Sequence, residues 1–135
     1  MSVIKLLFLS AEEIVAMHDE LLRRYGGAEG GGHRGPVDYA GVEAAASAVK
    51  NSYYEDVADL AAAYAVYIVQ GHVFQDGNKR AGAAAMLTFL YSNEVRTDLG
   101  LDDLSDLMVE LQRRAEAGER TDALVNWLAS FLSGT

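Results

Sequence analysis

Two apolar stretches, Leu60 to Val69 and Ala81 to Tyr91, dominate the middle of the chain. The first is apolar on every face of a helix and the second is nearly so, which predicts two helices buried in the middle of a bundle. Each is well short of the roughly 20 apolar residues that a membrane-spanning helix needs. The short polar segment between them therefore lies beside the core, where ionisable groups carry a desolvation cost unless they are paired or bind something.

Capping residues and helical spacing indicate an all-α fold. Ser10 and Glu13 form a capping box, in which hydroxyl and carboxylate satisfy the amides of a first turn, and Gly26 ends that helix. Asp56 is expected to cap the third helix and Thr121 the sixth. About six helices are expected: Ser10 to Gly26, about Asp38 to Lys50, Asp56 to about Val69, about Asn78 to Asn93, one through Leu104 that ends at Gly118, and one from Thr121.

Several segments outside this polar connection carry expectations of their own. Val3 to Leu9 is predicted to form a short edge strand or an extended arm, and the six glycines of Gly26 to Gly35 predict a mobile loop. His18 lies near the apolar face of the first helix and is interpreted as structural. Trp127 and Phe131, one turn apart, are predicted to lie in the core.

Length and charge restrict the class of protein. A chain of 135 residues predicts one domain over 1–135. Its 20 acidic and 11 basic residues give a net charge of -9, which argues against a broad nucleic-acid interface. The absence of cysteine excludes disulfides, thiolate catalysis and cysteine metal sites. With no predicted membrane span or export signal, a cytoplasmic protein without membrane partners is expected.

The segment His72 to Arg80 reads HVFQDGNKR and has the features of a phosphate site. A helix that begins at Asn78 presents unpaired first-turn amides and the positive end of its dipole to an anion. Gly77 allows the backbone to approach a bound group. Lys79 and Arg80 add positive charge, and arginine grips phosphate through two hydrogen bonds.

Three more side chains of this segment complete a catalytic inventory. Asp76 offers the hard oxygen ligand that Mg²⁺ takes alongside nucleotide phosphates. His72 is able to accept a hydroxyl proton near neutral pH. Phe74 is expected to fasten the segment to the core. Together these residues suit the transfer of a phosphorus group to a hydroxyl. The structural alternative for the whole set is a capped turn with solvated charges, and for Asp76 and Arg80 alone it is an ion pair.

The same nine residues match the motif H-x-F-x-(D/E)-G-N-(G/K)-R of the Fic fold at every specified position. Lys79, where most adenylylating members carry glycine, makes the segment resemble the death-on-curing (Doc) toxin branch. Leu9 to Gly27 and Tyr53 to Arg80 resemble that branch in order and spacing. The resemblance therefore covers most of the chain and implies a single-domain Fic-fold helical bundle with the motif loop between its two central helices.

The resemblance also implies an activity. His72 would be the catalytic base and Asp76 the Mg²⁺ ligand of a kinase that transfers the γ-phosphoryl group of ATP to a Ser or Thr hydroxyl. The protein would be the toxin of a toxin–antitoxin pair, restrained by an antitoxin chain, with a threonine of elongation factor Tu as the expected target and translation arrest as the result. The implied ATP- and phosphate-binding residues are Gly77, Asn78, Lys79 and Arg80.

Three positions bear on the alternatives. Ala83 stands where many adenylylating members have a second arginine, and the family's inhibitory pattern, Ser or Thr followed four residues later by Glu and then Gly or Asn, does not occur in the chain. Both favour the Doc branch. Gln70 stands where a basic residue is expected in close relatives. An adenylyltransferase and a Fic-fold binding module that has lost activity therefore stay open as alternatives.

Overall fold

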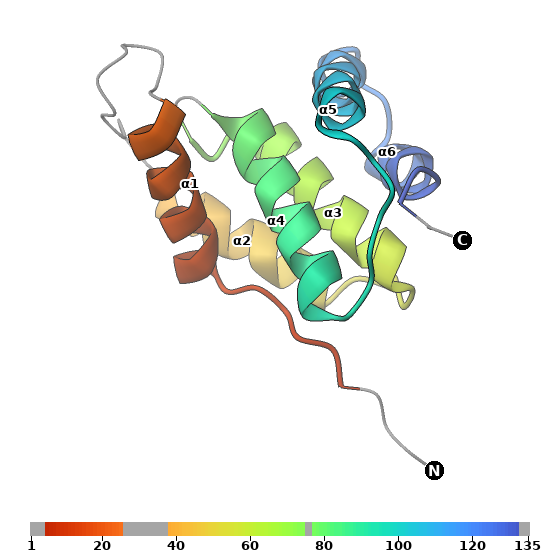
Figure 1. Cartoon of the computed structure of the whole chain (residues 1–135), viewed down its shortest axis with the longest axis horizontal. Helices are drawn as coiled ribbons and strands as arrows, with labels where there is room; N and C mark the ends of the chain where they lie inside the picture. The colour runs from red at the N-terminus through yellow and green to blue at the C-terminus, as the bar shows by residue number, and fades with distance from the viewer. Residues whose placement is uncertain (1–4, 26–37, 75–76, 133–135) are drawn as a thin grey trace.

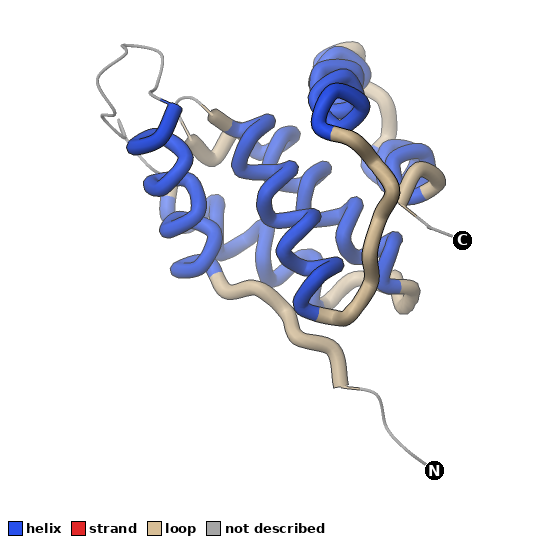
Figure 2. The backbone as a smooth tube through the Cα atoms, in the orientation of Figure 1, coloured by secondary structure: helices blue, strands red, loops and turns tan. Residues whose placement is uncertain are grey.

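The structure is a computed structural model that describes residues 5–25, 38–74 and 77–132. The regular secondary structure in these residues consists of α-helices. This all-α architecture confirms the predicted fold class (Figures 1 and 2). None of the described helices combines the length and apolarity of a membrane span. The helices are α1 (Ala11–Tyr25), α2 (Tyr39–Lys50), α3 (Val57–Gly71), α4 (Asn78–Ser92), α5 (Leu101–Glu116) and α6 (Thr121–Ala129).

Helix α3 lies at the centre of the bundle and packs against α2, α4, α5 and α6. Its residues from Leu60 to Val69 are buried except for the half-buried Tyr67, as expected of a helix without a polar face. Helix α4 runs back beside α3, and α1 and α2 lie on one side of this pair with α5 and α6 on the other (Figure 1). A Cβ atom on Gly82 would lie only 3.4 Å from Cα of Ala65, so this glycine allows α4 to approach α3 closely.

One predicted cap, at the start of α1, is present as a hydrogen-bonded structure, and α2 begins with a cap that was not predicted. The amide of Ser10 donates to Oε1 of Glu13 at 3.0 Å, and the amide of Glu13 donates to Oγ of Ser10 at 3.2 Å. At the start of α2, Oδ1 of Asp38 accepts from the amide of Gly41 at 2.9 Å. The two hydrogen bonds between Ser10 and Glu13 fix the start of α1, and the one from Gly41 to Asp38 fixes the start of α2.

The two other predicted caps are wrong in their chemistry. Asp56 occupies the N-cap position of α3, but its side chain makes no capping hydrogen bond. Thr121 is the first residue of α6, whose N-cap position is held by Arg120. The Thr121 hydroxyl instead donates to Oε1 of Gln70 at 2.9 Å. A contact with α3, which is remote in sequence, has taken the place of a local cap.

The N-terminal segment is an extended arm, so the edge-strand alternative is wrong for its described residues, 5–9. Every described neighbour is helical and offers no strand edge, so side chains satisfy the backbone of the arm. The amide of Leu7 donates to Oδ1 of Asn93 at 2.8 Å, and Nδ2 of Asn93 donates back to the Leu7 carbonyl at 3.1 Å. The amide of Leu9 donates to the Tyr64 hydroxyl at 2.8 Å. The rest of this segment and the predicted glycine loop, 26–35, lie outside the described residues.

The prediction that Trp127 and Phe131 both lie in the core is only half right. Trp127 is half-buried and packs against the core, whereas Phe131 is 45% exposed. Helix α6 ends at Ala129, so the helical spacing between the two rings does not place Phe131 on the buried face. The rings meet edge to face with centroids 5.6 Å apart.

Candidate active site

His72 lies where the chain leaves α3, and its backbone is left-handed, with φ 46° and ψ 46°. Its amide donates to the carbonyl of Val69 at 3.4 Å, and the residue is exposed. A non-glycine residue in this conformation costs on the order of 1–2 kcal/mol, and such strain is concentrated at functional sites. The turn ends α3 abruptly and leaves the predicted base at the surface.

The residues that follow His72 return into the protein. Val73 is buried, and its carbonyl accepts from the amide of Asp38 at 3.1 Å, which ties the segment to the start of α2. Phe74 is 3% exposed. Its ring stacks on that of His18 from α1, with centroids 3.7 Å apart and an interplanar angle of 9°. Helices α1 and α2 therefore both hold the segment in place.

Gly77 and Asn78 form the start of α4. Gly77 occupies the N-cap position with φ +83°, a conformation that favours glycine. The Asn78 side chain makes two hydrogen bonds with the backbone of Phe74: Oδ1 accepts from the amide at 3.1 Å, and Nδ2 donates to the carbonyl at 2.8 Å. Phosphate binding by Asn78 stays a prediction, for which its backbone amide is the suitable donor because the side chain is engaged.

Lys79 and Arg80 extend from the first turn of α4. Nζ of Lys79 donates to Oε1 of Gln112 on α5 at 2.9 Å, and Nε2 of Gln112 donates to Oε1 of Glu116 at 2.8 Å. The direct partner of the lysine is thus a neutral amide, which does not cancel its charge. Arg80 is exposed. Sequence reasoning missed Gln112, since nothing local to α5 marks it as a neighbour of the motif.

The predicted metal ligand, Asp76, lies outside the described residues together with Gln75. Within the ranges that the structure does describe, no group of three or more His, Asp or Glu side chains is arranged to hold a metal ion. Mg²⁺ at a nucleotide often takes only one or two protein carboxylates, with phosphate oxygens and water as its other ligands. The Mg²⁺ site therefore stays a prediction that rests on Asp76.

Gln70, near the end of α3, occupies the position where a basic residue was expected. Its Oε1 accepts from the Thr121 hydroxyl of α6, so this side chain joins two helices. It contributes no positive charge to the site. The cationic groups of the described motif residues are accordingly those of Lys79 and Arg80.

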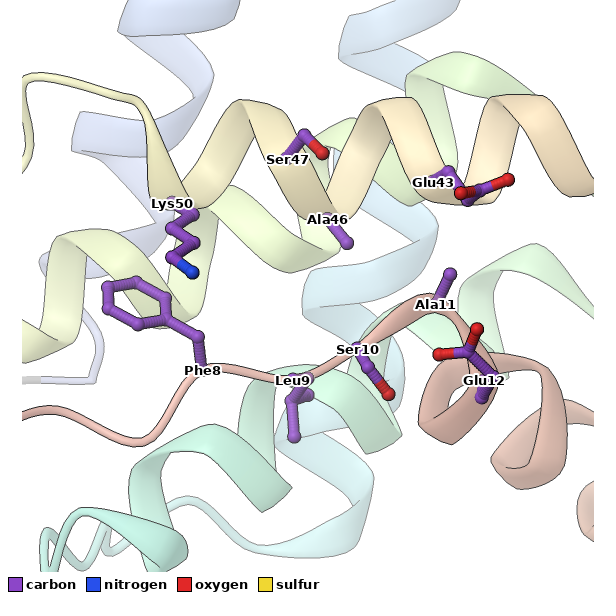
Figure 3. A pocket seen from close by; sticks show the side chains of 9 residues that line it. All are labelled: Phe8, Leu9, Ser10, Ala11, Glu12, Glu43, Ala46, Ser47 and Lys50. Atoms are coloured by element: carbon purple, nitrogen blue, oxygen red, sulfur yellow. The ribbon is translucent and has the colours of Figure 1, made fainter.

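A separate cavity of about 280 Å³ lies between the N-terminal arm and α2 (Figure 3). Glu12 and Glu43 lie toward one end of it and Lys50 toward the other. The pKa of Glu12 is lowered, chiefly by its own backbone amide and then by the Tyr39 hydroxyl. No motif residue lines the cavity, so it is distinct from the candidate active site. Its lining residues are Phe8, Leu9, Ser10, Ala11, Glu12, Glu43, Ala46, Ser47 and Lys50.

Comparison with known proteins agrees with the motif. The model of the Fic/DOC family matches residues 8–90, a range that contains α1 to α3, the motif and most of α4. The chain is also similar to the protein named protein kinase doc of Escherichia phage P1. The two are 36% identical over 105 residues, which cover 75% of this chain and 79% of the phage protein. Because the family model matches more than half of the chain, the chain belongs to the Fic/DOC family.

Proposed function

We propose that this protein is a Doc-type protein kinase, which transfers the γ-phosphoryl group of ATP to a Ser or Thr hydroxyl of a target protein. The observation that carries the proposal is the complete motif in the sequence, whose described residues begin at exposed His72 and end in the first turn of α4. The name of the phage relative, protein kinase doc, supports phosphoryl transfer over other Fic-type chemistry.

In the proposed reaction, an imidazole nitrogen of His72 accepts the proton of the target hydroxyl. The hydroxyl oxygen forms a bond to the γ-phosphorus while the bond between that phosphorus and the β–γ bridging oxygen breaks. ADP leaves, and the products are a phosphorylated side chain and a proton held on His72 that passes to solvent. The exposed position of His72 suits an approach by a second protein.

The start of α4 is the proposed phosphate grip. Its first-turn amides, with the Lys79 amine and the Arg80 guanidinium, would stabilise negative charge on the migrating phosphoryl group. Mg²⁺ held by Asp76 would neutralise part of the phosphate charge when bound. Lys79 also favours the kinase over the adenylyltransferase, because its side chain would fill space that the phosphates of an AMP donor need. It would also supply a positive charge for an ATP molecule bound in the opposite direction, with its γ-phosphate toward the target.

We further propose a biological setting by family resemblance. The protein would act in the cytoplasm as the toxin of a toxin–antitoxin pair, with an antitoxin chain as its inhibitor. Elongation factor Tu is the proposed target, and its phosphorylation would arrest translation. The net charge of -9 agrees with a protein target rather than a nucleic acid.

The test uses ATP labelled separately on the α- and the γ-phosphate, incubated with the protein, Mg²⁺ and a bacterial lysate. The kinase transfers only the γ label to a protein band, and His72→Ala abolishes transfer whereas Asn126→Ala, at an exposed position of α6, does not. Transfer of the α label would make the protein an adenylyltransferase. Growth inhibition that persists unchanged in His72→Ala, without transfer of either label, would make it a binding module.

A further inference from the structure

We propose that His18 is a positioning residue of the active site. Its flat imidazole ring, on α1, is the support on which the motif segment rests, and it thereby sets the position of His72 and of the start of α4. The kinetic part of this inference rests on the proposed phosphoryl transfer, whereas its structural part does not.

The burial of His18 is the first observation. The side chain is 2% exposed, and among the described residues it is the one polar or charged residue in the buried class. A histidine in the core gives up contact with water, which costs free energy. A side chain packed this tightly is held in one place, so its ring presents a fixed surface to the residues beside it.

The contacts of the ring on both sides of the motif segment are the second observation. One face lies parallel to the ring of Phe74, with a centroid separation of 3.7 Å. At its edge is Gly77, where a Cβ atom would lie 3.1 Å from Nε2 and 3.3 Å from Cδ2 of His18. His18 therefore stacks on the residue before positions 75–76, and its ring edge occupies the space that a side chain on the residue after them would need.

These contacts continue to the proposed reacting groups. Phe74, which stacks on His18, is joined through its backbone to both Oδ1 and Nδ2 of Asn78, the first residue of α4. The preceding residue, Val73, is joined to Asp38 at the start of α2. A shift of Phe74 would therefore move the first turn of α4, and with it the turn that carries His72. The planar ring is the part of His18 that supplies this support, since ring atoms make the stack on Phe74 and lie beside Gly77.

The experiment compares His18→Ala, which removes the ring, and His18→Phe, which keeps a flat ring. Ile14→Ala is the matched control, because Ile14 is fully buried one turn earlier on α1. Hydrogen exchange of the Phe74 amide, which donates to Asn78, reports the position of the motif segment without requiring any activity. Amides in the middle of α3 report global stability, and steady-state kinetics with ATP give kcat and KM separately.

In His18→Ala, exchange at the Phe74 amide is expected to become about tenfold faster relative to the α3 amides, because the motif segment opens locally. In Ile14→Ala the exchange rates of the Phe74 amide and of the α3 amides should change by the same factor. Where wild type transfers phosphoryl groups, kcat should fall about tenfold or more in His18→Ala, while Ile14→Ala retains the wild-type value below its unfolding temperature. His18→Phe should recover both the amide protection and most of kcat.

If the exchange rates of the Phe74 amide and of the α3 amides change by the same factor in His18→Ala, the inference is overturned, because His18 would then act only as a packed core residue. Failure of His18→Phe to restore Phe74 protection would overturn it as well, since the ring would not be the supporting element. A wild-type protein without phosphoryl transfer would contradict the proposed function alone. The exchange comparison would still decide the role of His18.

Discussion

The side chain of Asn78 joins the start of α4 to the backbone of Phe74: Oδ1 accepts from the Phe74 amide at 3.1 Å, and Nδ2 donates to the Phe74 carbonyl at 2.8 Å. An asparagine suits this position because one planar group carries both a donor nitrogen and an acceptor oxygen. The side chain at the start of α4 thus supports the turn, while the helix backbone provides amides for an anion. One residue of the motif serves both architecture and the proposed phosphate grip.

Asn78→Ala should lower the free energy of unfolding by about 1–2 kcal/mol, because two partly buried hydrogen bonds are lost. Phosphoryl transfer should fall as well, since Phe74, two residues after His72, is no longer joined to the start of α4. Urea denaturation measures the first effect. Asn126→Ala, at an exposed position of α6, is the control and should change stability by less than about 0.5 kcal/mol. Equal stability of the two variants would contradict the bracing role of Asn78.

His72→Gly should stabilise the protein and inactivate it at the same time. Glycine removes the Cβ that makes a φ of 46° costly, and after its own entropy cost the net gain should be about 0.5–1 kcal/mol. His72→Ala removes the base equally but keeps the strained Cβ, so it should show no such gain. Denaturation and γ-phosphoryl transfer measured on both variants test this. A His72→Gly protein no more stable than His72→Ala would show that the turn stores no strain.

The Tyr64 hydroxyl should make stability fall at high pH. Burial raises the pKa of Tyr64 from its ordinary value near 10 to about 12. The unfolded chain therefore releases this proton before the folded protein does, so stability is intact below pH 10 and is lost as the pH rises from 10 to 12. The contribution is about 2 kcal/mol. The stability difference between wild type and Tyr64→Phe should shrink over this range, and a difference that stays constant would refute the assignment.

Gln112→Glu should weaken the use of ATP. It would replace the neutral partner of Lys79 with a carboxylate, 2.9 Å from Nζ in the present geometry, which competes with donor phosphates for the amine. KM for ATP should rise about tenfold with a smaller change in kcat. Ser105→Glu adds the same charge at an exposed position of α5 and should leave KM unchanged. Equal effects of the two variants would mean that only net charge matters.

The helices that the sequence predicted well are those whose signals are local. Ser10 and Glu13 act within three residues, so a short pattern contains the whole cap. The apolar run of α3 likewise requires burial whatever surrounds it. The cap predicted at Thr121 failed because a hydroxyl has more than one possible partner, and the partner in the fold, Gln70, lies 51 residues away.

The motif was predictable as a set of residues but not as an arrangement. His18 comes four residues after Ile14 on the apolar face of α1, which indicated burial, yet nothing in the sequence pairs it with Phe74. The hydrogen bond from Lys79 on α4 to Gln112 on α5 likewise joins two residues that are 33 positions apart. Such contacts depend on how α1 and α5 pack against the ends of α3 and α4, which helical periodicity alone does not determine.

Mass spectrometry of the modified target tests the central claim most directly, because it identifies the reaction and the substrate together. A bacterial lysate is treated with ATP and either wild-type protein or His72→Ala, and modified peptides are compared. The kinase mechanism predicts a phosphorylated Ser or Thr, on elongation factor Tu, that is present with wild type and absent with His72→Ala. An adenylylated residue in its place, or phosphorylation that survives the loss of His72, would contradict the mechanism.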